Sequence, residues 1–105
     1  DALGLTPDPF TLQMANHLLD GVRALEAGFA SLGKTPTEAA QKADLARHAE
    51  RKVEKLYRKA LAALFQGDDY ILMFKRREIY RHLTNAAERM AHCANTLQDI
   101  VVKMV

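Results

Sequence analysis

Apolar residues recur at intervals of three and four along three long segments, which is the period of an amphipathic α-helix. No segment shows the strict alternation of apolar and polar residues that is typical of a half-buried strand. We therefore predict three helices, at about residues 9–32, 36–66 and 69–105. Their predicted buried stripes are Met14, Leu18, Val22, Leu25, Phe29 and Leu32, then Leu45, Ala49, Val53, Leu56, Ala60 and Leu64, then Ile79, Leu83, Ala86, Met90, Cys93, Leu97, Ile100 and Met104.

Capping residues separate the three segments. An Asp or Thr just before a helix accepts a hydrogen bond from a free backbone N–H, and a Pro at the first helical position needs no N–H partner. A Gly after the last apolar position is typical of a helix end, because Gly adopts the left-handed conformation readily. The predicted N-caps are Asp8, Thr35 and either Asp68 or Asp69, and the predicted terminators are Gly33 and Gly67.

The short connections and the heptad-like spacing in 69–105 predict an all-α fold, an antiparallel three-helix bundle with long helices that forms one domain over residues 1–105. At 1.5 Å per residue the third helix spans about 55 Å and the first about 37 Å, so the third must extend beyond the first. We expect the apolar end "IVVKMV" to be the extension. Covering it requires a second copy or more chain, which predicts a homodimer or a fragment of a two-bundle protein.

Composition excludes several classes of function. The net charge of +2 is too small to indicate a nucleic-acid partner, and no apolar run approaches the ~18–20 residues of a membrane span. The single cysteine, Cys93, suits a reducing compartment and is predicted to be a small core residue. Ser31 is the only serine, and no phosphate-binding glycine loop is present. We therefore expect a cytoplasmic, non-enzymatic protein.

Two pairs of potential metal ligands lie on the second and third predicted helices. Glu50 and Glu54 are four residues apart, as are Glu88 and His92, so the members of each pair share a side of their helix. Helical bundles bind metals through such pairs, and carboxylates with imidazole suit iron, zinc or manganese. An ordinary solvated surface, with the glutamates paired to nearby Arg and Lys, explains the same residues, and the spacing alone favours that interpretation.

The segments "HAERKVEKLYRKALAALF" (48–65) and "KRREIYRHLTNAAERMAHCANTLQDIVVKMV" (75–105) resemble the C-terminal half of the PhoU-like phosphate transport regulators. These are the relatives often encoded beside Pit-type phosphate transporters. The resemblance implies a PhoU-like three-helix bundle, of which family members usually have two. It also implies metal ions, such as iron or zinc, on the bundle surface at an E/D-x-x-x-D motif that Glu50-x-x-x-Glu54 matches conservatively. The third helix departs from the family, with Asn85, Glu88, His92 and Asn95 where acids are common.

The resemblance implies a regulator or accessory protein of inorganic phosphate transport. It would act by docking onto a transporter or signalling protein, with peripheral association at the inner face of the membrane. The alternative is a di-metal helical-bundle enzyme or a metal-storage protein. Such proteins generally place Glu and Glu-x-x-His ligands inward, whereas Glu88 and His92 have a Glu-x-x-x-His spacing and lie opposite the predicted seam. A third interpretation is a helical adaptor without a ligand.

Overall fold

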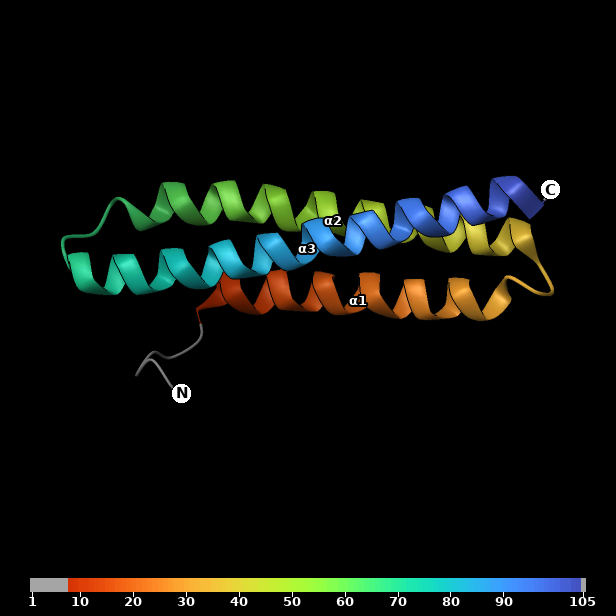
Figure 1. The fold of residues 1–105 in the computed structure, drawn as a ribbon. Coiled ribbons are helices and arrows are strands. Elements are labelled where there is room, and N and C mark those ends of the chain that lie inside the picture. The colour runs from red at the N-terminus through yellow and green to blue at the C-terminus, as the bar shows by residue number, and fades with distance from the viewer. Residues whose placement is uncertain (1–7, 105) are drawn as a thin grey trace.

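The computed structural model describes residues 8–104, and within that range it contains three helices and no strand. Helix α1 comprises Pro9–Ser31, α2 comprises Pro36–Leu64 and α3 comprises Tyr70–Met104. The helices lie side by side, with α3 along both others, in a bundle of 55 × 23 × 16 Å (Figure 1). The predicted three-helix fold is confirmed. Residues 1–7 of the predicted domain and the predicted helix end at Val105 lie outside the described residues.

Two of the predicted N-caps are confirmed. The Asp8 carboxylate accepts a hydrogen bond from the Thr11 N–H at 2.7 Å, with Pro9 at the first helical position. The Asp69 carboxylate accepts one from the Leu72 N–H at 3.1 Å. Each bond satisfies a backbone donor that has no partner inside its own helix, which fixes where the helix begins.

The predictions for the α1–α2 connection were wrong in detail. The Thr35 side chain makes no capping hydrogen bond, and the Gly33 backbone is not left-handed. Instead, the backbone N–H groups of Lys34 and Thr35 both donate to the Ser31 carbonyl, at 3.1 and 2.8 Å. A free carbonyl at the end of α1 is therefore satisfied without a left-handed glycine.

Small residues bring α1 close to both other helices. A Cβ added at Gly28 would lie 2.7 Å from Cδ2 of Leu97 and 2.9 Å from Cβ of Lys42, and one added at Gly21 would lie 2.6 Å from Cε of Met90. Both glycines are buried. On α2, the side facing this contact is lined by buried alanines, namely Ala39, Ala43, Ala46 and Ala49. The helices approach closely because almost no side chain separates them.

The buried side of α3 is rotated from the predicted one. Met90 and Leu97 are buried as predicted, but Cys93 is exposed, so its assignment to the core was wrong. Two small residues that the prediction omitted, Ala87 and Ala94, are fully buried, which turns the buried stripe away from Cys93. The buried residues of α3 are Tyr80, Thr84, Ala87, Met90, Ala94, Leu97 and Val101.

The predicted stripes of α1 and α2 are partly correct. Val22 is 48% exposed, Phe29 42% and Leu45 53%, so these three residues do not belong to the core. The close contact at the glycines leaves no space for them between the helices. The predicted core positions that are buried are Met14, Leu25, Ala49, Val53, Ala60 and Leu64.

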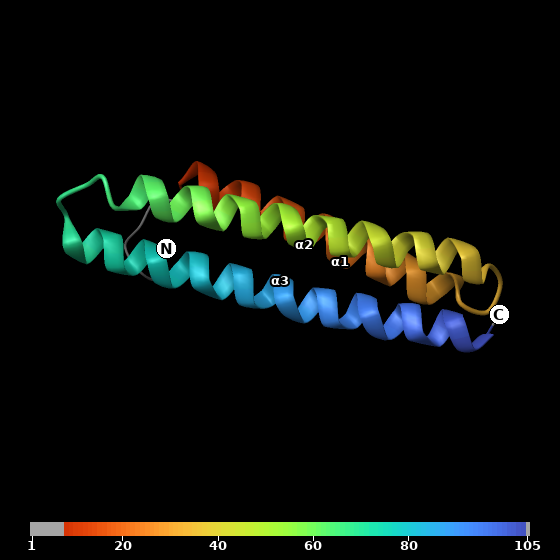
Figure 2. The same ribbon diagram turned by 90° about the horizontal axis from the view of Figure 1, so that it is seen from above.

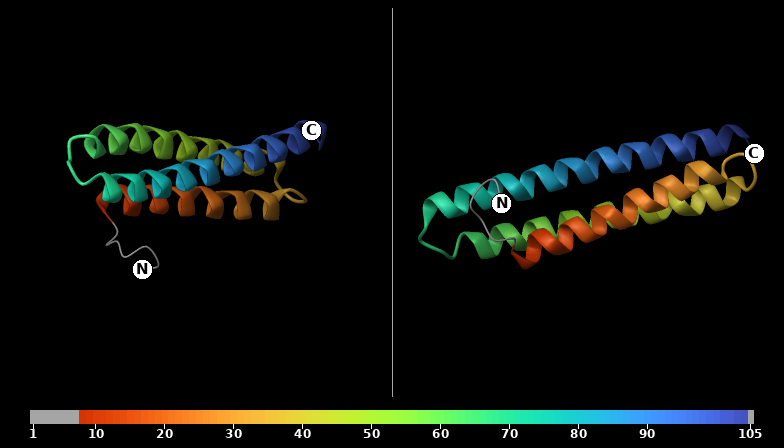
Figure 3. Two further views of the ribbon diagram at one scale, coloured as in Figure 1. Left: turned by 60° about the vertical axis from the view of Figure 1, so that its left-hand side comes forward. Right: turned by 90° about the horizontal axis from the view of Figure 1, so that it is seen from below.

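Helix α3 does extend beyond α1, but at the opposite end from the prediction. Near the C-terminus, Val101 is buried in a core cluster against which Leu32 packs. At the other end, the Asp8 carboxylate accepts a hydrogen bond from the Tyr80 hydroxyl and lies 3.6 Å from Nε of Arg76. The start of α1 is therefore level with the second and third turns of α3, and the α2–α3 connection projects beyond it (Figures 2 and 3).

The contact between Asp8 and Tyr80 changes the acidity of both groups. Burial acts to raise the pKa of Asp8, but hydrogen bonds from Tyr80 and Thr11 and the charge of Arg76 outweigh it, so the pKa lies below its usual value. Burial and the bond to Asp8 raise the pKa of Tyr80. The carboxylate and the neutral phenol therefore coexist at neutral pH and hold α1 to α3.

Gly28→Ala should lower the free energy of unfolding by about 1 kcal/mol, measured by urea denaturation followed by circular dichroism. Overpacking a core typically costs ~1–3 kcal/mol, which exceeds the gain of about 1 kcal/mol from the higher helix propensity of Ala. Gly33→Ala is the control, because an added Cβ there meets no atom within 4 Å. Equal stability of the two variants would contradict the close contact at Gly28.

Candidate functional site

Three glutamates from two helices interact at the outer edge of the α2–α3 contact. Glu50 and Glu54 lie one turn apart on α2, and Glu88 on α3 is close enough for its charge to act on Glu50. Glu50 is partly buried, and its Oε2 atom is enclosed with no hydrogen-bond partner among the described residues. The structure therefore brings together three of the four predicted ligands, which we call the carboxylate cluster.

The environment of Glu50 disfavours its charged form. Burial raises the pKa of the Glu50 carboxyl, and so do the negative charge of Glu54 and the hydrogen bond that a protonated carboxyl can share with it. The more distant charge of Glu88 acts in the same direction, while Arg51 opposes it. A proton or a cation at this position would relieve the repulsion between the carboxylates.

His92, the fourth predicted ligand, is exposed, and no interaction of its side chain with the carboxylate cluster is present in the described range. Its backbone carbonyl accepts a hydrogen bond from the Thr96 hydroxyl at 3.1 Å. Among residues 8–104, no group of three or more His, Cys, Asp or Glu is arranged to hold a metal ion. A metal site at Glu50, Glu54, Glu88 and His92 stays a prediction, with the enclosed Glu50 oxygen as the feature that fits a cation best.

Two polar residues of α3, Asn95 and Gln98, have a structural role that the sequence did not reveal. Arg47 of α2 donates to the Asn95 side-chain oxygen at 3.1 Å and to the Gln98 oxygen at 3.5 Å. Asp44, three residues before Arg47, accepts from the same guanidinium. The only sequence signal for this brace is the Asp44–Arg47 spacing, which is common on helix surfaces. Asn95 therefore links two helices.

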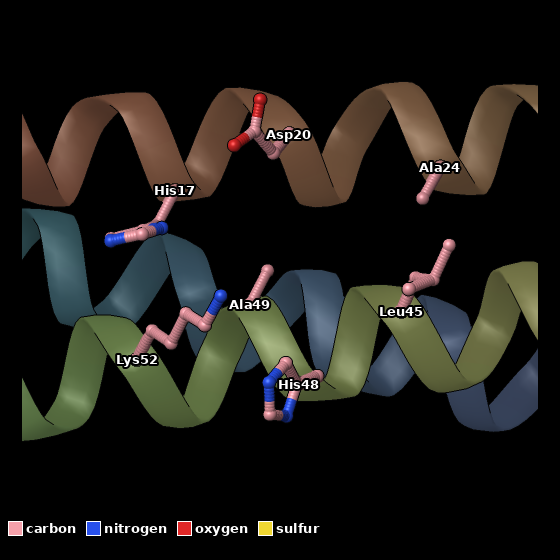
Figure 4. A pocket seen from close by; sticks show the side chains of 7 residues that line it. All are labelled: His17, Asp20, Ala24, Leu45, His48, Ala49 and Lys52. Atoms are coloured by element: carbon pink, nitrogen blue, oxygen red, sulfur yellow. The ribbon is translucent and has the colours of Figure 1, made fainter.

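A shallow groove between α1 and α2 contains two histidines. His17 extends from α1 into the gap between the helices, whereas the His48 ring lies on the side of α2 away from His17. The two rings therefore do not converge (Figure 4). The Lys52 side chain also enters this groove. The arrangement offers no set of ligands around one point. The groove is lined by His17, Asp20, Ala24, Leu45, His48, Ala49 and Lys52.

Large apolar side chains are exposed along one side of α1. Leu12, Leu19, Val22 and Phe29 are 42–54% exposed, and at 100° per residue they lie within an arc of roughly 100°. The residues of α1 that line the groove with α2 are on the opposite side of α1 (Figure 4). The exposed apolar side is therefore turned away from α2. Exposed Cys93 and Met104 continue the apolar surface on α3. We call this surface the α1–α3 face.

Comparisons with protein-family models, with curated proteins and with solved structures find no match to this chain. None of the described helices has the length and apolarity that crossing a bilayer requires. The interpretation of function therefore rests on the surfaces described above and on the resemblance in the sequence.

Glu50→Gln should stabilise the protein at pH 7 and have little effect near pH 4, measured as the shift in Tm. Because the folded-state pKa of Glu50 is raised, its contribution to stability is present below its unfolded pKa and is lost as the pH rises through the folded pKa. A Gln side chain does not ionise, so the variant keeps this stability at pH 7. Asp99→Asn, at an exposed site on α3, is the control and should shift Tm little at either pH. A destabilising effect of Glu50→Gln at pH 7 would contradict the raised pKa of the Glu50 carboxyl.

Proposed function

We propose that this chain is a non-enzymatic helical bundle that acts by docking to other proteins through the α1–α3 face. The observation that carries the proposal is the row of large apolar side chains exposed along α1. Contiguous apolar surface in contact with water is unfavourable, and in folded proteins it commonly marks a contact with a partner. The heptad-like spacing of Leu12, Leu19, Val22 and Phe29 suits a partner helix packed lengthwise.

The composition of the core supports a non-enzymatic role. Thr84 is the one buried polar residue in the described range. Di-metal bundle enzymes and metal-storage bundles place their carboxylates inward, between the helices. Here the carboxylate cluster lies at the outer edge of the α2–α3 contact, which favours a surface ion site over an internal reaction centre.

The resemblance of residues 48–65 and 75–105 to the PhoU-like regulators supports a more specific role. We propose an accessory protein of inorganic phosphate transport in the cytoplasm, which forms a dimer through the α1–α3 face and in that form contacts a phosphate transporter or a signalling protein. The phosphate role depends on the resemblance alone. The docking role depends on the exposed face.

A second copy of the chain fits the α1–α3 face. Gly21 of α1 contacts Met90 of α3, and Gly28 contacts Leu97. In both pairs the α3 residue has a number 69 higher than its α1 partner, so residue 95 of α3 lies at the same height along the bundle as Glu26. Glu26 and Arg89 have no ion-pair partner in the described range. An antiparallel second copy, related by a two-fold axis level with residue 92, would place Glu26 of each copy beside Arg89 of the other. Such an arrangement is closed and self-complementary.

Val22→Asp/Phe29→Asp should convert a dimer at micromolar concentration to a monomer, measured by light scattering, with helix content unchanged. Two charges in a contact that excludes water should weaken association by more than about a hundredfold. Leu45→Asp is the matched control, because Leu45 is equally exposed but lies on α2. It should remain a dimer, and a bismaleimide should cross-link Cys93 between copies of the wild type and of this control.

The same variants test the role in cells. In a host strain that lacks the gene, phosphate uptake should be restored to its normal regulation by the wild type and by Leu45→Asp, but not by Val22→Asp/Phe29→Asp. A wild-type monomer would contradict the homodimer. Equal uptake with all three proteins would contradict docking through the α1–α3 face.

Iron, zinc or manganese should raise the Tm of the wild type if the carboxylate cluster binds a cation, because a ligand that binds only the folded state stabilises it. Glu54→Gln/His92→Ala should abolish most of this increase. Asp99→Asn, at an exposed site on α3, is the control and should keep it. Equal increases in all three proteins, or none in the wild type, would contradict a metal site at these residues.

A further inference from the structure

Four of the five most exposed large apolar side chains among the described residues gather at one end of the bundle, the fifth being Val102 near the C-terminal end of α3. Phe65 is 61% exposed, Tyr70 77%, Ile71 72% and Phe74 61%. All four lie at or next to the connection between α2 and α3, at the end that projects beyond α1 in Figures 1 and 3. We call these four residues the apolar tip.

The position of α1 explains why none of its own residues covers the tip. Its N-cap, Asp8, is held by Tyr80 and Arg76, and α3 begins ten residues before Tyr80. Those ten residues of α3 rise about 15 Å beyond the level of that contact. The end of the bundle is therefore a two-helix hairpin, too thin to bury four large side chains.

The same end of the molecule is positively charged. Residues 55–81 contain seven of the fifteen Lys and Arg residues but three of the thirteen Asp and Glu residues, a formal charge of +4. The Asp8 carboxylate, which lies beside Arg76, lowers the charge of this end to +3, and the remaining residues sum to −1. This asymmetry separates the tip from the α1–α3 face, which carries one exposed acid and one exposed base, Glu26 and Arg89.

We propose that the apolar tip inserts into the interface of an anionic lipid membrane, with the surrounding cations on the lipid phosphates. Aromatic and aliphatic side chains with adjacent Lys and Arg are the composition of interfacial membrane contacts. Insertion is about 5–10 Å deep in such contacts. Lys59 lies five residues before the end of α2 and Arg77 seven after the start of α3, or about 8 and 10 Å along the helices. Both cations are exposed and would reach the level of the headgroups.

Two acids at the apolar tip limit how deeply it can insert into the membrane. The Asp69 carboxylate accepts the Leu72 N–H at the positive end of α3, which partly compensates its charge. Asp68 is exposed beside it. Such a tip rests in the headgroup layer, where carboxylates stay hydrated, and does not reach the hydrocarbon.

The test uses the 105-residue chain with vesicles of phosphatidylcholine alone or mixed with phosphatidylglycerol. The wild type should sediment with the mixed vesicles, and less so at high salt. Ile71→Ser/Phe74→Ser should weaken this binding by more than about tenfold, because each side chain loses apolar surface that the membrane would bury. Lys59→Glu/Arg77→Glu should weaken it similarly. Val22→Asp/Phe29→Asp is the control and should bind like the wild type, which separates this proposal from docking through the α1–α3 face.

A fluorescence measurement distinguishes insertion from charge attraction alone. The chain has no tryptophan, so Tyr70→Trp provides a single reporter at the tip, and Val22→Trp one on the α1–α3 face. Only Tyr70→Trp should shift its emission to the blue when anionic vesicles are added. Equal behaviour of the two reporters, or no binding of the wild type, would overturn the proposal, and the tip would then be a contact for a protein.

Discussion

The close approach of α1 to its neighbours at Gly21 and Gly28 determines the rest of the structure. With no Cβ at these positions, the backbone of α1 lies against Ala49 and Lys42 of α2 and against Met90 and Leu97 of α3. Where glycines of α1 meet alanines of α2, the contact is narrow, and dispersion contacts across it depend on short distances between the helices. The large apolar side chains that such a core cannot enclose are displaced to its margins.

This displacement produces the surfaces to which we assign function. Val22 and Phe29 belong to the apolar stripe of α1 by their spacing, but they lie outside the narrow contact and form part of the α1–α3 face. The bond between Asp8 and Tyr80 then fixes how far α1 reaches along α3. Because α1 starts late, the hairpin of α2 and α3 extends alone and exposes the apolar tip. The two proposed contacts, with proteins and with lipid, thus depend on two structural features, the narrow glycine contact and the Asp8–Tyr80 bond.

The carboxylate cluster arises from a different feature, the antiparallel contact of α2 and α3. Glu50 is enclosed enough for its neighbours to disfavour its charge, while the nearby Arg47–Asn95 bond braces the same pair of helices. A site that holds like charges together destabilises the folded chain at neutral pH unless a proton or a cation compensates. An ordinary solvated surface would avoid that arrangement, so the raised pKa of Glu50 distinguishes the cluster from such a surface.

The sequence by itself determined the number of helices, their approximate ends, the cap at Asp8, a cap at either Asp68 or Asp69, and the position of Glu50 and Glu54 one turn apart on the same helix. These features depend on neighbours within four residues, so local spacing is sufficient. The tertiary structure alone decided that Cys93 and His92 are exposed, that the charge of Glu88 acts on Glu50, and which end of α3 projects. A periodic pattern marks the apolar arc of a helix. The depth to which each residue in that arc is buried depends on the distance between helices, which the glycines and alanines of other segments set.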